Sequence, residues 1–176
     1  RYTLYLNFMF DLISVGDSTI DNFVQIHDAE VKCNLSKSSC QLCVEYGDKI
    51  PVDKLTHLVA GNAANNAVGS ARLKLGTAIY TNIGSDPAGQ QILAKLKSEG
   101  VNTRYVVINE GMESNLSTVL IFQGERTIFV YHQQWKYRLP DLDSSKWVYF
   151  SLKITLIHTI KNKKIDAAPF SSSPGS

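Results

Sequence analysis

Several polar side chains and a glycine in the first half of the chain have the types and spacing to bind hydroxyl groups. The segment AGNAANNAVGSARL places Gly61 at a predicted strand-to-helix corner, with Asn62 and Asn65 in the first turn of the helix. Glycine lets the backbone approach a ligand closely, and side-chain amides both donate to and accept from hydroxyls. This pattern suits a polyol. The alternative interpretation is that the asparagines only cap the helix.

A carboxylate, Asp21, lies a few residues beyond the first predicted strand, in the segment GDSTID. An ionised carboxylate can accept two hydroxyl hydrogen bonds, and such charge-assisted bonds contribute about 1.5 to 3 kcal/mol each. Asp21 can therefore orient a sugar, although a turn or helix cap is an equal alternative on the bare sequence. The sequence contains neither GxGxxG nor GxxxxGKS, so it predicts neither a dinucleotide fingerprint nor a P-loop.

The cysteines cluster between positions 33 and 43, as Cys33, Cys40 and Cys43. A CxxC spacing suits tetrahedral zinc, and His27 or His57 is a candidate fourth ligand. Structural zinc sites usually have four ligands, however, and the chain has no second CxxC, so we favour reduced free thiols in a lid insertion. Because the number of cysteines is odd, we do not expect a disulfide framework.

Alternating strands and amphipathic helices must position these residues. Small and apolar residues share one face of a helix predicted over 62–75, with Gly76 as its stop, and a second helix begins at Asp86 and Pro87. Predicted core strands occupy 10–15, 77–83, 105–108 and 147–151. Strands and helices that alternate at this spacing predict right-handed crossovers and a mostly parallel sheet.

Two stretches break this alternation. Residues 22–58 are irregular, with short strands predicted at 23–26 and 45–52, and we interpret them as an insertion or lid. The runs 117–122 and 127–132 flank a predicted four-residue loop and form a hairpin. We place Trp135, with Tyr131 and His132, at the edge of that hairpin and outside any site.

Composition narrows the class of protein. A chain of 176 residues with 44% hydrophobic content can bury one sizeable core, so we expect one globular domain. Its net charge of +2 is made by scattered residues, and no apolar run is long enough to span a bilayer. We therefore expect a cytoplasmic protein without a nucleic-acid or membrane partner. Residues 1–9 are predicted to be an upstream extension, and residues 152–176 a disordered tail.

Three segments in the order GDSTID, GNAANNAVGSARLKL and GSDPAG resemble the N-terminal signature of the ribokinase-like (PfkB-type) carbohydrate and nucleoside kinases. The resemblance covers residues 10–151. It implies a three-layer α/β fold, with a mostly parallel sheet flanked by helices and a small β lid at about 22–58 and 115–133. It also implies that the family's C-terminal half is missing from this chain.

The resemblance also assigns roles to individual residues. Asp21 and Asn65 would bind sugar hydroxyls, and Gly61 would let the sugar approach, with Asn62 beside it. Ser117 or Thr118 of the lid hairpin would face the substrate. Because the lid often mediates dimers in this family, a homodimer through the lid is expected.

The implied activity of the complete protein is transfer of the γ-phosphate of ATP, with Mg²⁺, to a hydroxymethyl group of a sugar or nucleoside. The family takes its catalytic Asp and its anion hole from a GAGD-like motif. Here the only GD pairs, Gly16 with Asp17 and Gly47 with Asp48, lie early in the chain and lack a glycine-rich corner. We therefore predict a substrate-binding half with no catalytic residue and no bound ATP or metal. The alternatives are a non-catalytic sugar- or nucleoside-binding module, a subunit that requires a partner, and an inactive fragment.

Overall fold

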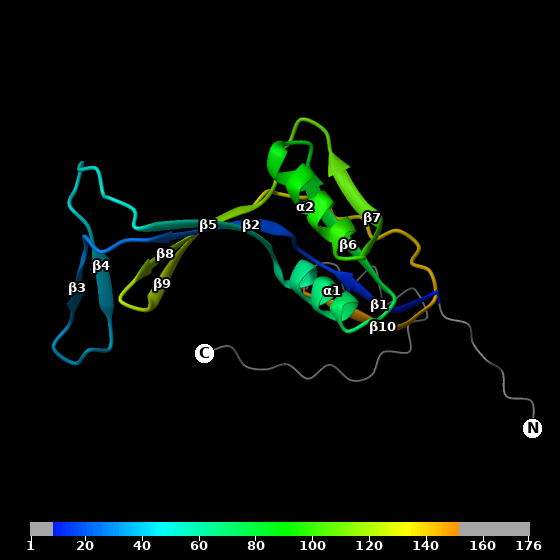
Figure 1. The fold of residues 1–176 in the computed structure, drawn as a ribbon, viewed down its shortest axis with the longest axis horizontal. Coiled ribbons are helices and arrows are strands. Elements are labelled where there is room, and N and C mark those ends of the chain that lie inside the picture. Colours follow the sequence, from blue (N-terminus) through cyan, green and yellow to red (C-terminus); the bar gives the residue numbers. More distant parts are fainter. Residues whose placement is uncertain (1–8, 152–176) are drawn as a thin grey trace, which may run out of the picture.

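The described residues form two four-stranded β-sheets that meet at a junction, with helices on only one of them, and a separate two-stranded sheet (Figure 1). The structure is a computed structural model that describes residues 9–151, so the predictions for residues 1–8 and 152–176 lie outside it. In order, the elements are β1 (Phe10–Val15), β2 (Thr19–Gln25), β3 (Glu30–Cys33), β4 (Cys40–Cys43), β5 (Lys54–Ala60), α1 (Asn62–Arg72), β6 (Thr77–Gly84), α2 (Pro87–Ser98), β7 (Asn102–Asn109), β8 (Leu116–Phe122), β9 (Glu125–Tyr131) and β10 (Ser145–Phe150).

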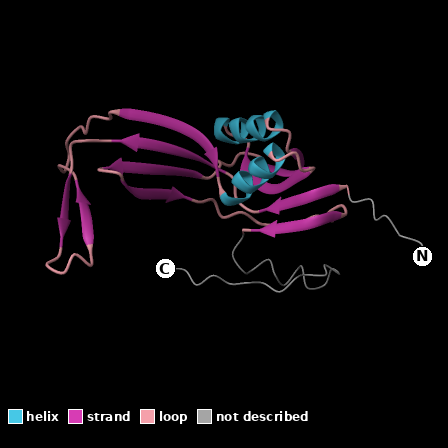
Figure 2. Ribbon diagram, turned by 60° about the horizontal axis from the view of Figure 1, so that its bottom comes forward, coloured by secondary structure: helices cyan, strands magenta, loops and turns pink. Residues whose placement is uncertain are grey.

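The main sheet is parallel, with strand order β10-β1-β6-β7. All eight residues of β6 are buried, and its side chains alternate between two cores. On one face, Ile79 and Ile83 pack with α1 and α2. This arrangement confirms the predicted α/β fold with a mostly parallel sheet, and Figure 2 shows both helices on the same side of that sheet.

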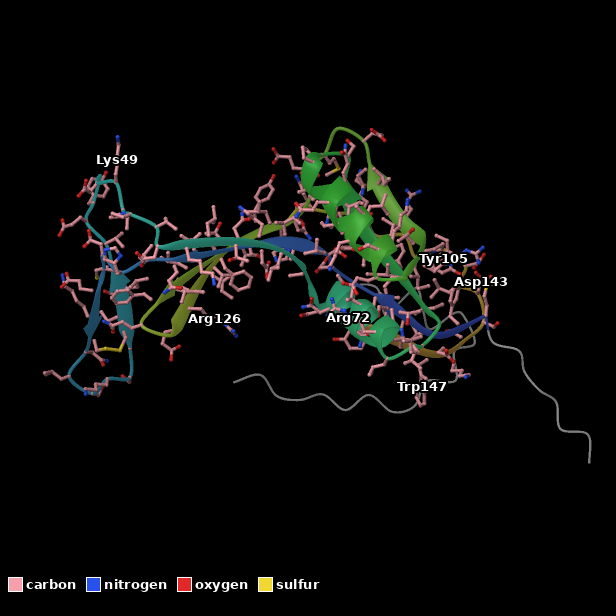
Figure 3. The ribbon with its side chains drawn as sticks, viewed as in Figure 1. Lys49, Arg72, Tyr105, Arg126, Asp143 and Trp147 are labelled. Carbon is pink, nitrogen blue, oxygen red and sulfur yellow. A yellow bond between two sulfur atoms is a disulfide. The ribbon has the colours of Figure 1, made fainter. Side chains whose placement is uncertain are left out.

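The opposite face of the main sheet is covered by the extended segment 132–144, which runs between β9 and β10. The backbone N–H of Arg138 donates to Tyr80 Oη at 2.9 Å, and Tyr105 Oη donates to the Asp143 carboxylate. The labelled side chains of Tyr105 and Asp143 lie together in Figure 3. These bonds hold an irregular segment in place where the resemblance predicts a helical layer.

A second sheet, which we call the lid sheet, has the order β5-β2-β8-β9. β2 pairs antiparallel with β5 and parallel with β8, and β8 pairs antiparallel with β9. The lid sheet extends away from the helices, and the β3–β4 hairpin lies at its far end (Figure 1). The chain passes from β1 of the main sheet directly into β2 of the lid sheet, which joins the two.

The described elements differ from the predicted ones at several positions. α1 ends at Arg72, and Lys74 just beyond it has a φ of 68°, which is outside the helical range. The sequence instead predicted that Gly76 would end the helix. Gly76 N–H instead donates to Asp11 Oδ2 at 2.7 Å. The β8–β9 turn contains two residues, Gln123 and Gly124 with φ of 51° and 85°, and not four, because two residues with positive φ close a tight hairpin.

The strands of the predicted lid region 22–58 were only partly predicted. The strand predicted at 23–26 coincides with the end of the longer β2, whereas the one predicted at 45–52 is wrong, and β3, β4 and β5 were not predicted. The burial of β5 does not alternate regularly, since most of its residues are exposed on the open lid sheet. An exposed strand lacks the period-2 pattern from which strands are predicted.

The second helix follows its prediction closely. Asp86 is the N-cap of α2 and accepts a hydrogen bond from the Gly89 N–H at 2.9 Å. Ile92 and Leu96 are fully buried against the main sheet. None of the helices in the part of the chain that the structure describes is long and apolar enough to cross a membrane.

Candidate functional site

The site residues predicted from the sequence lie around the junction of the two sheets. Gly61 connects β5 to α1 with a φ of 101°, and a Cβ atom there would lie 2.5 Å from the carbonyl oxygen of Asp17 and 2.8 Å from the Cα of Ser18. Only glycine allows two backbone segments to come this close. The glycine is therefore required by the fold of the junction itself, and its role in admitting a ligand stays a prediction.

Asp21 lies on β2, two residues beyond the junction. In register it faces Leu58 of β5 and Ser117 of β8. Its Oδ1 atom is buried and has no hydrogen-bond partner among the described residues. Burying a carboxylate oxygen without a partner costs free energy, so this oxygen is a candidate acceptor for a polar ligand.

The asparagines of α1 divide into two groups. Asn62 and Asn65 are exposed in the first turn, and the N-cap is Gly61, which makes no side-chain cap bond. The alternative that these asparagines are present as N-caps is therefore wrong. Asn66 instead accepts a hydrogen bond from Ser14 Oγ at 2.6 Å, which fixes α1 on β1.

A shallow groove of about 220 Å³ lies on the lid sheet. The groove is lined by Phe23, which is the next residue after Asp21 on the same face of β2, and by Leu58, which is the register partner of Asp21. The other lining residues are Gln25, Lys54, Thr56 and Ile121. Residues two apart on a strand share a face, so the groove continues from Asp21 over a largely apolar surface. Such a surface can cover the carbon face of a sugar while the carboxylate holds its hydroxyls.

The lid hairpin places only one of its two predicted candidates beside Asp21. Ser117 is the register partner of Asp21, whereas Thr118 is the partner of Asn22 and belongs to the next row. Successive residues of a strand point to opposite faces. The geometry thus favours Ser117 over Thr118 as the residue on the substrate side.

Sequence reasoning missed the pair formed by Asp17 and Tyr137. Tyr137 Oη donates to Asp17 Oδ1 at 2.5 Å, across 120 positions of the chain. Burial raises the pKa of Tyr137, and the hydrogen bond and charge of Asp17 raise it further. The phenol therefore stays protonated and holds the segment 132–144 against the junction. No local pattern in the sequence indicates a contact between residues so far apart.

Trp135 was also placed wrongly. β9 ends at Tyr131, and Trp135 lies beyond it in the segment 132–144 with only 8% of its surface exposed. The residue is therefore buried and does not form the edge of a hairpin. The sequence after Tyr131 does not show where strand pairing stops.

The prediction of free thiols is wrong for two of the three cysteines. Cys33 and Cys40 form a disulfide between β3 and β4, and Cys43 is free. The register sets Cys33 directly opposite Cys40, and a hairpin register cannot be read from cysteine spacing. No group of three His, Cys, Asp or Glu side chains suited to a metal occurs in residues 9–151. His27 and His57 bind Asp53 and Asn22 instead.

The geometry defines an α/β protein in which a mostly parallel main sheet, with two helices on one face, joins a second sheet. A model of the pfkB family of carbohydrate kinases matches residues 24–160. Since this match covers more than half of the chain, the protein belongs to the pfkB carbohydrate kinase family.

Individual relatives agree with this assignment. The chain is 28% identical to an uncharacterized sugar kinase of Pyrococcus horikoshii over 106 residues, which are 60% of this chain and 34% of that protein. Among solved structures, the Cryptococcus neoformans ribokinase in complex with ADP has a TM-score of 0.63 at 21% identity, covering 86% of this chain and 43% of that one. The Arabidopsis thaliana ribokinase complexed with ribose and ATP has a TM-score of 0.56 at 21% identity, covering 70% and 36%.

These structural likenesses show a shared fold. The chain itself spans about a third of the length of the curated relative, with 34% of that protein covered. The chain therefore corresponds to one part of that relative.

Proposed function

We propose that the complete protein transfers the γ-phosphate of ATP to a hydroxymethyl group of a sugar or nucleoside, and that this chain provides the substrate-binding half. The observation that carries the proposal is the buried, unpartnered Oδ1 of Asp21 at the junction of the two sheets. A substrate hydroxyl would donate to this oxygen. Asn65 and Asn62 present free amides on the first turn of the adjacent helix, where they can bind further hydroxyls.

The described residues do not fit ATP or Mg²⁺. Phosphoryl transfer requires donors around the phosphates and carboxylates for the metal, but residues 9–151 contain no group of three metal-binding side chains and the sequence has no P-loop. We therefore derive no catalytic step from this chain. ATP use is supported by the family and by the ribokinases solved with ADP and with ribose and ATP.

The second candidate function is a non-catalytic sugar- or nucleoside-binding module, or a subunit that requires a partner. It is favoured by the same division of residues, because the hydroxyl-binding set lies in this chain and a GAGD-like motif does not. An inactive fragment is the third alternative. A cytoplasmic location and a homodimer through the lid sheet remain part of the proposal.

Ligand-induced stabilisation tests the substrate site. We expect ribose, fructose or adenosine to raise the free energy of unfolding, by about 2.7 kcal/mol at a hundred times the dissociation constant. Asp21→Asn keeps the shape of the side chain but removes its charge, so it should abolish the shift. Asp28→Asn, at an exposed position after β2, is the matched control.

The outcomes separate the alternatives. No shift with any of these ligands would leave the inactive fragment as the surviving alternative. A shift that Asp21→Asn leaves unchanged would remove Asp21 from the site while keeping a sugar-binding chain. ATP-dependent phosphorylation by the isolated chain would contradict the division into a binding half and a catalytic half.

A further inference from the structure

Four further side-chain atoms are buried without a hydrogen-bond partner in the described part of the chain. They are Ser18 Oγ, Thr81 Oγ1, Asn115 Nδ2 and Trp135 Nε1. Thr81 lies inside β6 of the main sheet, whereas the other three residues belong to segments that meet at the junction. Buried polar groups are nearly always hydrogen-bonded, so three unpartnered atoms in segments that meet at the junction require an explanation.

Asn115 lies on the same face of the lid sheet as Asp21. The Ile20 N–H donates to the Asn115 carbonyl at 3.2 Å, which continues the β2–β8 ladder by one residue. Asp21 and Ser117 are register partners, and residues two apart on a strand share a face. Asn115 thus occupies the position next to Ser117 in the row that faces Asp21, with 1% of its surface exposed.

Trp135 is linked to Asn115 through Gln133 by two hydrogen bonds from backbone N–H groups. The Gln133 N–H donates to Asn115 Oδ1 at 2.9 Å, which uses the acceptor of the amide and leaves its Nδ2 donors free. The Trp135 N–H donates to the Gln133 carbonyl at 3.0 Å. Two residues later, Tyr137 is bonded to Asp17. The segment that carries the indole is therefore fixed to the junction on both sides of Trp135.

The chemistry of the free atoms defines the class of ligand. Asn115 Nδ2 and Trp135 Nε1 can only donate, and the ionised Asp21 can only accept. A hydroxyl group satisfies both, because its oxygen accepts while its hydrogen donates. A carboxylate ligand would accept from the donors but would be repelled by Asp21 and Asp17. The set therefore matches a neutral polyol.

We propose that Asn115 and Trp135 are further substrate-binding residues, which donate from their side chains to hydroxyl oxygens of a neutral sugar held by Asp21. This inference rests on the proposed substrate-binding function and narrows its ligand to neutral sugars over sugar acids. Ser18, fully buried beside Gly61, carries the third of the unpartnered atoms at the junction.

The test uses the two tryptophans of the chain, Trp135 and Trp147. Trp147 is 68% exposed on β10, at the main-sheet end of the molecule and far from Lys49 in the loop between β4 and β5 (Figure 3). Trp147→Phe leaves Trp135 as the single emitter, and titration with the best-binding neutral sugar should change its fluorescence. Trp135→Phe leaves only Trp147, whose emission should not respond to the sugar.

Affinity supplies the second readout. We expect Trp135→Phe to raise the Kd of the neutral sugar about tenfold, which corresponds to about 1.4 kcal/mol, and Trp147→Phe to leave it unchanged. For one monodeoxy analogue of that sugar, we expect the wild type to bind the analogue about tenfold more weakly than the sugar. Trp135→Phe should bind the analogue and the sugar equally well, because the hydroxyl missing from the analogue is the partner of the N–H missing from the variant. A structural effect of the substitution would not depend on which hydroxyl is missing.

Asn115→Asp is the second variant, because it keeps the Oδ1 acceptor for Gln133 and removes the free donors. Its control is Asn102→Asp, where an exposed amide likewise accepts from a backbone N–H. We expect a higher Kd for Asn115→Asp but not for Asn102→Asp.

The outcomes separate this inference from the proposed function. If the wild type binds sugar and both site variants, Trp135→Phe and Asn115→Asp, bind it equally well, the inference is overturned and the proposed function stands. If the wild type binds a sugar acid more tightly than the neutral sugar, the ligand class is overturned. If it binds no sugar, both fall.

Discussion

The main sheet and the lid sheet differ in how completely they are buried. All eight residues of β6 are buried, with α1 and α2 on one face and the segment 132–144 on the other. All seven residues of β9 are exposed, including four large hydrophobic ones at 128–131. Hydrophobic burial can therefore hold the main sheet in place, but it holds the outer strand of the lid only weakly.

The two sheets also contribute differently to the junction. The part of the junction that belongs to the main sheet, Gly61 against Asp17, is fixed by backbone contact. The part that belongs to the lid sheet carries Asp21 and Ser117, the register partners that we propose lie on the substrate side. An exposed hydrophobic edge strand is also a typical surface for pairing with a second copy, which is the arrangement proposed for the homodimer.

The same substitution in the two sheets should give the largest contrast. Ile79→Ala removes a fully buried side chain from β6, whereas Ile128→Ala removes one that is 47% exposed on β9. We expect a loss of about 2 to 5 kcal/mol in the free energy of unfolding for Ile79→Ala, because a cavity remains. Ile128→Ala should cost about 0.5 kcal/mol or less, as surface substitutions do. Urea denaturation of both variants measures the two values.

Protein concentration provides the control for this contrast. At low concentration, Ile128→Ala and the wild type should unfold at the same urea midpoint. If Ile128 is buried by a second copy, the cost of Ile128→Ala will grow with protein concentration, while that of Ile79→Ala will not. A large, concentration-independent cost for Ile128→Ala would show that the two sheets do not differ in the way described here.

The same division explains which elements were predictable. In the main sheet, β1, β6 and α2 were predicted nearly to the residue, because buried strands are continuous apolar runs and α2 has an Asp cap and Pro at its start. In the lid sheet, β5 was missed and the β8–β9 loop was drawn too long. Exposed strands are specified by their neighbours, and local sequence carries little of that information.

The site shows the same limit. Asp21, Gly61 and Asn65 could be proposed from the sequence because they stand in short motifs near predicted strand and helix ends. Asn115 and Trp135 could not be, because they reach the junction only through long-range hydrogen bonds and an irregular segment. Nor could the spacing of the cysteines reveal the disulfide, since Cys33 and Cys40 become neighbours only through a hairpin register.

A smaller effect is expected at Asp86, whose carboxylate accepts from the Gly89 N–H and from Ser114 Oγ at 2.6 Å. Asp86→Ala should lower the free energy of unfolding by about 1 kcal/mol, as is typical for the loss of a helix N-cap. Asp48→Ala is the matched control from the lid region, because Asp48 also accepts from a backbone N–H, that of Lys49, but in an exposed loop. Thermal or urea unfolding should show no change for Asp48→Ala.

The contribution of Asp86 should also depend on pH. Burial raises the pKa of this carboxyl, but the hydrogen bonds from Ser114 and Gly89 outweigh it and lower the pKa below 3.8. Because the folded-state pKa is lower than the unfolded one, the contribution is complete above pH 3.8 and is lost as the pH falls through the folded value. The gap between wild type and Asp86→Ala should therefore narrow in acid. A gap that stays constant would show that Asp86 is protonated or that its bonds do not stabilise α2.

The smallest global effect should come from reducing the Cys33–Cys40 disulfide at the far end of the lid. Every residue of β3 is exposed, so the β3–β4 hairpin buries little of its own surface, and the disulfide restricts its unfolded chain. With dithiothreitol we expect trypsin to cleave faster at Lys32 or Lys37, while the urea midpoint of the whole protein stays the same. Cys33→Ser without reductant should behave like the reduced wild type, and Cys43→Ser like the oxidised one. A fall in the global midpoint on reduction would show that the hairpin supports the lid sheet. In that case a protein in the cytosol, where most disulfides are kept reduced, would lose this support of the lid sheet.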